Sequence, residues 1–200
     1  MKKVIVLIGM GLAAISCKTP VFSKAEKALI NEASAETAFR ILQVTGRQDS
    51  VLLRTPCAGL NYFANDPTLR RLVARMKTTL LTGNGVGIAA PQVGISRNIF
   101  LFMRLDLPGE PIVTAINPKI VNHPDTTICF ERDGCLSIPN FQGNSIRYPW
   151  VEVEYYNEKG ELIRERLEGY SRHDTFTSII FQHEYDHLQG ILFTDKLCEE

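Results

Sequence analysis

The sequence predicts an α+β fold, in which helices and antiparallel strands occupy separate parts of the chain. Three observations support this prediction. Helical spacing of apolar residues marks the stretches 23–44 and 66–83, short apolar runs broken by Pro and Gly fill 98–153, and a last helical stretch begins at 174–175. The chain has 200 residues, of which 44% are hydrophobic, so it is long enough to bury one substantial core in a single main domain.

Charge and composition argue against several classes of protein. Lys plus Arg (22) balances Asp plus Glu (22), and no run of like charge is long enough to bind nucleic acid. No repeat with a period of about 20–50 residues and no low-complexity tract occurs, so a solenoid is not expected. A small or peptide-like partner is therefore expected rather than DNA, and we expect the protein to be a monomer.

The first 17 residues, MKKVIVLIGMGLAAISC, have the layout of a secretory signal peptide. Two lysines precede an apolar stretch, residues 4–15, that is too short to span a bilayer comfortably. Ala-Ile-Ser-Cys at 14–17 resembles a bacterial lipoprotein cleavage box, although leucine is commoner than alanine at its first position. We expect an exported protein anchored to a membrane through a lipidated Cys17. The alternative is an unprocessed leader, which would form a buried strand or helix of a cytoplasmic protein.

A helical N-terminal extension is expected to follow, at residues 18–45. Residues 23–26, Ser-Lys-Ala-Glu, form a capping box that opens a helical pattern of apolar residues running towards Val44. This extension could pack on the main domain, residues 46–200, or act as a spacer. The sequence leaves both arrangements open.

Each remaining element has a signal of its own. Asp66-Pro67 places an N-cap before a proline at the first helical position, and Gly83 ends that helix. Apolar residues alternate over 151–155, as in a half-exposed strand, and residues 157–160 form a hairpin turn. The last helix is expected to end at Gly190.

Histidine spacing in that last helix indicates a metal site. The stretch QHEYDH contains His-Glu-x-x-His, and residues four apart on a helix lie one above the other, so His183 and His187 can bind the same ion. Glu184 lies about 100° around the axis, where its carboxylate can act as a base without being a ligand. Two of only four histidines fall in this stretch, which argues against an inert helix.

A catalytic metal site needs a third protein ligand, and the best candidate lies upstream. The 13 residues after His187 contain carboxylates but no histidine. Cys135, in the stretch Asp-Gly-Cys-Leu-Ser at 133–137, offers a thiolate, which is a strong ligand for Fe(II) or Zn(II). A second loop, GVGIAAPQ at 85–92, has little side-chain bulk, so a substrate backbone could lie against it; a structural turn is the alternative.

The other cysteines and histidines show no pattern of their own. Five cysteines at irregular spacings make a disulfide framework a poor explanation, so Cys57, Cys129 and Cys198 are expected to be thiols without chemistry. His123 and His173 lack ligand spacing and are expected on the surface or in loops.

Three stretches together resemble a known family. GVGIAAPQ, DGCLS and QHEYDH are similar, in order and spacing, to the three motifs of peptide deformylases: G-x-G-x-A-A-x-Q, E-G-C-L-S and H-E-x-x-H. The resemblance covers roughly residues 40–197. It implies a deformylase-like fold, with antiparallel sheets packed around a central helix that carries HExxH.

The resemblance also implies the role of each site residue. Cys135, His183 and His187 would bind one divalent metal, Fe(II) or Zn(II), with Ni(II) or Co(II) as substitutes. Glu184 would be the general base and acid. The side chain of Gln92 and the backbone N–H of Leu136 would donate to the oxygen of the attacked carbonyl. The partner would be an N-formylated peptide or nascent-chain N-terminus, and the products would be formate and a free amine.

A substrate pocket and one departure complete this comparison. The family predicts a pocket for a methionine side chain, to which the apolar residues Val86, Phe176, Ile179 and Ile180 correspond, beside Gly87 of the Gly-rich loop. Asp133 stands where the family has glutamate, which there pairs with an arginine matched by Arg147. The shorter carboxylate puts support for the Cys135 loop in question.

Two other functions compete with a formyl-peptide hydrolase. An exported lipoprotein could bind formyl peptides without cleaving them, but the five side chains that the reaction needs are all present. An HExxH endopeptidase is disfavoured because the third candidate ligand is an upstream cysteine. The predicted leader points outwards while nascent formylated chains are cytosolic, so the location of the substrate stays open.

Overall fold

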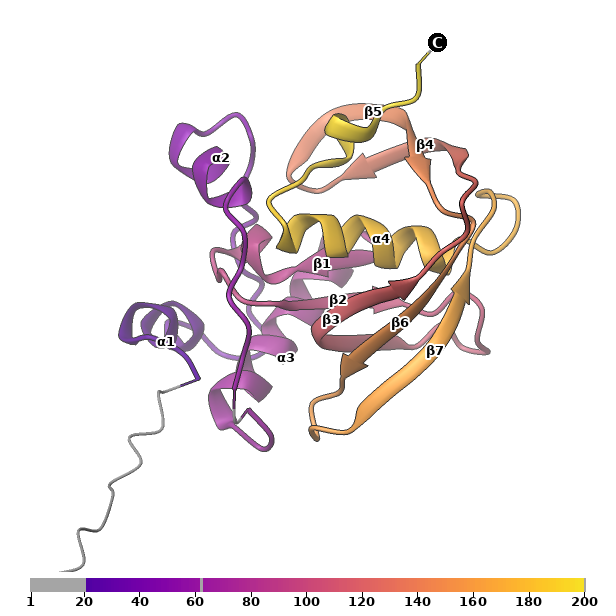
Figure 1. Ribbon diagram of the computed structural model, residues 1–200. Coiled ribbons are helices and arrows are strands. Elements are labelled where there is room, and N and C mark those ends of the chain that lie inside the picture. Colours follow the sequence, from indigo (N-terminus) through magenta and orange to yellow (C-terminus); the bar gives the residue numbers. More distant parts are fainter. Residues whose placement is uncertain (1–20, 62, 200) are drawn as a thin grey trace, which may run out of the picture.

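Two antiparallel sheets and a central helix make up the fold (Figure 1). The computed structural model describes residues 21–61 and 63–199, so the predicted signal peptide and Cys17 lie outside the described residues. The main sheet has the order β1 (Gly87–Ala89), β2 (Ile99–Met103), β3 (Ile112–Asn122), β6 (Trp150–Tyr156) and β7 (Leu162–Glu168). The second sheet pairs β4 (Ile128–Cys135) with β5 (Ile138–Arg147).

Within the described residues, four α-helices and two 3-10 helices pack on and between these sheets. They are α1 (Lys24–Asn31), α2 (Arg47–Leu53), α3 (Pro67–Thr82), α4 (Thr177–Leu188), η1 (Ala90–Val93) and η2 (Phe193–Lys196). Helix α4 lies between the two sheets (Figure 1), and every residue in it except Tyr185 is buried. The predicted α+β fold with a central HExxH helix is therefore confirmed.

The main sheet packs on both of its faces because neighbouring residues in a strand point to opposite sides. In β2, Ile99 and Leu101 belong to a core shared with α3, while Phe100 and Phe102 belong to a core shared with α4. Phe181 of α4 packs edge-on against both of these phenylalanines. This burial holds α4 at a fixed position over the sheet.

Several predicted boundaries agree with the structure. The Asp66 carboxylate accepts hydrogen bonds from two backbone N–H groups at the start of α3, which ends just before Gly83. Strand β6 buries alternate residues, and its hairpin with β7 turns over the predicted residues 157–160. His123 and His173 are exposed, as expected.

The predicted helix running towards Val44 is wrong beyond Asn31. Helix α1 ends there because the buried guanidinium of Arg75 binds the carbonyl oxygens of Leu29 and Ile30, at 2.9 and 3.1 Å. The chain then continues without helical structure over residues 32–46, which buries Phe39 and Leu42.

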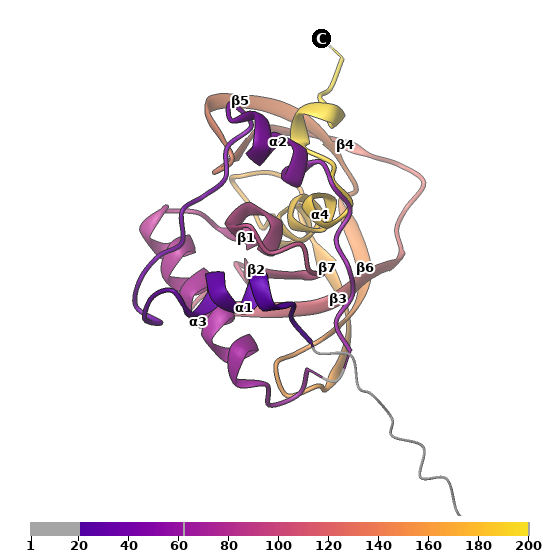
Figure 2. The ribbon, with the colours of Figure 1, turned by 90° about the vertical axis from the view of Figure 1, so that its left-hand side faces the viewer.

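The extension packs on the main domain and is not a spacer. Figure 2 shows α1 beside α3, and Phe22 and Ile30 belong to the same buried core as α3. Further on, the backbone N–H of Val44 donates to the carbonyl of Ser137 at 3.0 Å. The predicted boundary between the extension and the catalytic domain, at residues 45 and 46, stays a prediction.

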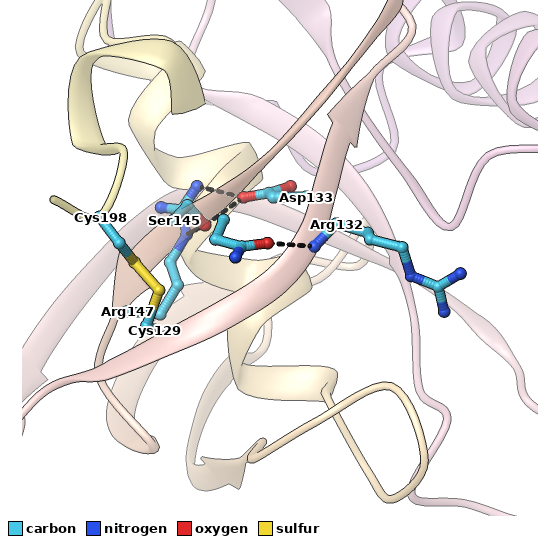
Figure 3. The surroundings of a disulfide bond; sticks show 7 residues. Cys129, Arg132, Asp133, Ser145, Arg147 and Cys198 are labelled. Carbon is cyan, nitrogen blue, oxygen red and sulfur yellow. Dashed lines mark hydrogen bonds and ion pairs between the residues drawn. A yellow bond between two sulfur atoms is a disulfide. The ribbon is translucent and has the colours of Figure 1, made fainter. Parts of the chain in front are cut away.

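The expectation that Cys129 and Cys198 are free thiols is wrong, because they form a disulfide (Figure 3). The two cysteines are 69 residues apart in sequence, but their Cα atoms lie 6.0 Å apart. Leu197 forms a bridge with Ser145 of β5, which brings the end of the chain to this sheet. Cys57 is free and half-buried, and burial raises its pKa to about 12, as expected of a thiol without chemistry.

The described residues include no helix that is both long enough and apolar enough to cross a membrane.

Candidate metal centre

Three potential ligands meet where α4 faces the end of β4. One side-chain atom each of Cys135, His183 and His187 lies within 4.8 Å of the other two, and the Cys135 Sγ is 3.2 Å from His187 Nε2. No other group of three such ligands occurs in residues 21–61 and 63–199. A soft thiolate beside two imidazoles suits Fe(II) or Zn(II), so the donor set fits the predicted metal.

The Asp133 carboxylate orients the His183 ring through a hydrogen bond. One carboxylate oxygen of Asp133 is 3.0 Å from His183 Nδ1, and the other accepts hydrogen bonds from Arg147 at 2.8 Å and from Ser145 at 2.6 Å (Figure 3). Such a partner fixes the ring orientation of a metal-binding histidine. Burial alone would raise the pKa of Asp133, but His183 and Arg147 outweigh it and hold that pKa far below its usual range. The shorter carboxylate therefore does reach Arg147.

Arg147 extends these contacts into a network of alternating charges, which is buried except at Lys196. The Nη1 atom of Arg147 donates to the Asp186 carboxylate at 2.6 Å, and Asp186 accepts a further hydrogen bond from Lys196 at 2.6 Å. Because two carboxylates face two cations, the charges in the network balance. We call Asp133, Arg147, Asp186 and Lys196 the charge network; it joins β4, β5, α4 and η2.

Glu184 is buried beside the ligands with one oxygen free. Its side chain is 4% exposed, and the Oε2 atom has no hydrogen-bond partner within the described part of the chain. Burial raises the pKa of Glu184 to about 8. A carboxyl group with a pKa near neutrality can both accept and donate a proton, which general acid–base catalysis requires.

The glycine of β1 makes room for Glu184. A Cβ atom added at Gly87 would lie 2.4 Å from the Glu184 Oε1 atom and 2.8 Å from its Cδ atom. A side chain at residue 87 would force the Glu184 carboxyl group to move, and glycine instead brings bare backbone against that group. This contact explains a glycine in the loop that the sequence alone also allowed as a structural turn.

Gln92 points its amide towards the same site. The side-chain oxygen accepts a hydrogen bond from the Ala89 N–H at 2.8 Å, which fixes the amide so that Nε2 faces inwards. This nitrogen lies 3.4 Å from the Cys135 Sγ and 3.2 Å from the Ser137 Oγ. A fixed donor of this kind can stabilise an oxyanion.

A cavity of about 720 Å³ opens onto these residues. Its lining includes all the residues expected to bind substrate, together with Gln92, Leu136 and Glu184. Sequence reasoning missed several further lining residues, among them Phe130 and Arg172, because they lie outside the motifs. The predicted site residues that the structure brings to this cavity are Val86, Gly87, Phe176, Ile179 and Ile180.

Known proteins resemble this chain in both sequence and fold. A profile of the polypeptide deformylase family matches residues 41–200. The chain belongs to the peptide deformylase family. A peptide deformylase from Thermotoga neapolitana is 42% identical over 133 residues, which cover 66% of this chain and 74% of the relative.

Solved deformylases superpose on this chain. The crystal structure of the Thermotoga maritima peptide deformylase has a TM-score of 0.70 and 34% identity, covering 81% of this chain and 99% of the other. A class I type b peptide deformylase from Acinetobacter baumannii with Met-Ala-Ser bound also gives 0.70, at 31% identity and the same coverage.

Membership of this family decides among the three functions considered. The chain is a metal-dependent hydrolase that removes the N-formyl group from N-terminal formylmethionine peptides and releases formate. A binding protein without activity and an HExxH endopeptidase are the less supported alternatives. The candidate metal centre, formed by one cysteine and two histidines, agrees with the metal dependence of deformylases.

Proposed function

We propose that Glu184 is the general base and acid of deformylation in this chain. Its carboxyl group is buried next to the three ligands, its Oε2 atom has no partner among the described residues, and burial raises its pKa to about 8. Glu184 takes the proton from the attacking water and passes it to the amine of the departing peptide. This isolated carboxyl group is the observation that carries the proposal.

Gln92 and Leu136 stabilise the negative charge that develops on the formyl oxygen. The Gln92 amide is held by Ala89, so its Nε2 donor needs no reorganisation during the reaction. Leu136 follows Cys135 directly and lines the same cavity, where its backbone N–H is the second donor.

Cys135, His183 and His187 would hold one divalent ion, either Fe(II) or Zn(II), with Ni(II) or Co(II) as substitutes. When bound, the ion lowers the pKa of water and polarises the formyl carbonyl. His183 receives its orientation from Asp133, which supports its assignment as a ligand. An oxidising surrounding would favour Zn(II), because Zn(II) has no redox chemistry.

The substrate is an N-formylated peptide whose first side chain enters the apolar part of the cavity. Val86, Phe176, Ile179 and Ile180 line that part and suit an unbranched thioether. We call these four residues, together with Phe130, the side-chain pocket. Gly87 leaves room for the peptide backbone beside β1.

Formate release from formyl-Met-Ala-Ser tests these roles. The protein is purified without oxygen and loaded separately with Fe(II), Ni(II) and Zn(II). We expect Glu184→Ala and Glu184→Gln to lose about 10²–10⁴-fold in kcat, while Glu36→Gln, at an exposed carboxylate, retains activity. Full turnover by either Glu184 variant would refute the assignment.

We also propose that the protein is exported and anchored to a membrane through a lipidated Cys17. The layout of residues 1–17 supports export. An independent observation is the Cys129–Cys198 disulfide, because disulfides persist in oxidising compartments and are rare in the cytosol. Its substrates would then be formylated peptides outside the cytosol, released by proteolysis.

Expression in a bacterial host tests the location. We expect a membrane fraction in which the mature protein carries lipid and an intact disulfide, and Cys17→Ser should abolish lipid labelling. Full-length protein in the cytosol with a reduced Cys129 and Cys198 would show that the leader is not processed.

A further inference from the structure

Arg172 lies at the side-chain pocket without belonging to any deformylase motif in the sequence. It occupies the loop between β7 and α4 and contributes to the lining of the cavity, beside Phe130 and Phe176. Its guanidinium carbon lies 5.3 Å from the centre of the Phe130 ring and 5.4 Å from that of Phe176. The two rings lie 5.6 Å apart, so the charged group covers an aromatic pair.

Hydrogen bonds to β4 hold the guanidinium in this position. The Nε atom of Arg172 donates to the carbonyl of Glu131 at 3.2 Å, and Nη2 donates to the carbonyl of Arg132 at 2.6 Å. The pairing of β4 with β5 shifts register between Phe130 and Asp133, so Glu131 and Arg132 fall outside the regular ladder. The backbone N–H of Arg172 adds a third bond, to the Glu131 carboxylate at 2.8 Å.

We propose that Arg172 is a specificity-determining residue that closes the side-chain pocket and limits the length of the substrate's first side chain. The inference rests on the assignment of this pocket to that side chain. An unbranched side chain of methionine length fits beside Phe130 and Phe176 with Arg172 in place. A longer one must displace the guanidinium and break its hydrogen bonds to Glu131 and Arg132, which weakens binding.

A structural role alone makes a different prediction. If Arg172 only fastened its loop to β4, its removal would lower the activity towards all formyl peptides by the same factor. A residue that closes the pocket instead changes the ratio between substrates. The discriminating quantity is therefore kcat/KM for a formyl peptide with a long unbranched first side chain, divided by kcat/KM for formyl-Met-Ala-Ser.

The test compares Arg172→Ala with the native protein on formyl-Met-Ala-Ser and on the same peptide with 2-aminodecanoic acid in place of methionine. We expect the ratio to rise at least about 10-fold in Arg172→Ala, mainly through a lower KM for the long substrate.

Arg132→Ala is the matched control. Arg132 is exposed on the irregular part of β4 that Arg172 binds, and its side chain points away from Asp133 and Arg147 (Figure 3). This variant removes one positive charge from the segment that Arg172 binds and should leave the ratio unchanged. Arg172→Lys keeps the charge but loses the two-pronged hydrogen bonding, so it should raise the ratio by a smaller factor.

Two outcomes would overturn the proposal. One is an unchanged ratio in both Arg172 variants, and the other is an equal rise in Arg132→Ala. If Arg172→Ala does not fold, Arg172→Lys decides the question alone. If the native protein did not cleave formyl-Met-Ala-Ser, the proposed function would be refuted instead, so the two failures are distinguishable.

Discussion

The two regions that supply the candidate metal ligands are stabilised in different ways. Helix α4, which carries His183 and His187, is buried along nearly its whole length between two sheets. Cys135 ends β4, which pairs only with β5 in a two-stranded sheet whose second strand is largely exposed. Two strands by themselves are at best marginally stable in water.

The charge network and the disulfide supply what the small sheet lacks in apolar burial. Arg147 joins Asp133 of β4 to Asp186 of α4, and the disulfide joins β4 to the end of the chain. The candidate metal centre therefore depends on apolar packing around α4, and on charge pairing and a covalent bond at the β4–β5 sheet. This difference can be tested by removing each kind of support.

The largest effect is expected for Arg147→Met, which leaves Asp133 and Asp186 without their shared cation. Removing one partner of a buried ion pair costs about 3–5 kcal/mol, since the other charge stays buried and unpaired. We expect this loss in the free energy of unfolding by urea, together with lower metal content. The matched control is Arg164→Met, whose ion pair with Glu154 is exposed, with 69% of the arginine side chain accessible; it should cost at most about 0.5 kcal/mol. Equal losses in the two variants would contradict the comparison.

The next effect concerns the disulfide. The double variant Cys129→Ala with Cys198→Ala should lose about 2–4 kcal/mol, because the cross-link no longer restricts the unfolded chain. Native-state hydrogen exchange should show a larger loss of protection in β4 and β5 than in β2 and β3. Cys57→Ala, at a free cysteine, is the control. Equal loss of protection in all four strands would show that the two regions unfold together.

Gly87→Ala tests the contact between β1 and α4 at the site itself. The new Cβ would meet the Glu184 carboxyl group at 2.4 Å, so that group has to move. A displacement of about 1 Å at a catalytic group can cost about 100-fold in rate, so we expect a fall of this order in kcat/KM with a smaller change in Tm. Gly46→Ala, whose added Cβ has its nearest atom at 3.5 Å, should retain activity. Native activity in Gly87→Ala would show that the close approach is unnecessary.

The smallest effect is expected at the ion pair of Glu26 with Arg97, which joins α1 to the main domain at 2.6 Å. Burial raises the pKa of Glu26, but hydrogen bonds from Arg97 and Ser23 outweigh it, so the pKa lies below the ordinary value of 4.5. Because the folded-state pKa is depressed, the stabilisation is present above pH 4.5 and is lost as the pH falls through the folded-state value. Glu26→Gln should therefore cost less than about 1 kcal/mol at neutral pH, and its cost should shrink as the pH falls through the folded-state pKa of Glu26. A cost independent of pH would show that the charge is irrelevant.

Local signals in the sequence predicted the elements whose boundaries depend on neighbouring residues. The N-cap at Asp66 and Gly83 predicted α3, and the alternation in β6 predicted a half-buried strand. HExxH needs only one turn of helix to place His183 and His187 on one face. The sequence also named Cys135 as the third ligand candidate, and the structure brings it to the histidines, while the catalytic roles stay predictions.

Contacts between distant residues decided what the sequence alone did not. Helix α1 ends at Asn31 because Arg75, more than forty residues away, binds its last carbonyls. Neither α2 nor the separate β4–β5 sheet was predicted, because short elements and strand pairing depend on partners elsewhere in the chain. The disulfide was not predicted for the same reason, since its two cysteines meet only after folding.

The sequence by itself predicted the chemistry of this protein: the candidate ligand types, the carboxyl group beside them and the Gly-rich loop with its amide. These follow from motifs in which spacing along one helix or loop sets the geometry. Only the tertiary structure decided how Cys135 is supported and which distant residues line the pocket. Arg147 and Arg172 act on residues far away in the sequence, and no local pattern records such contacts because side-chain packing and charge pairing depend on the folded chain as a whole.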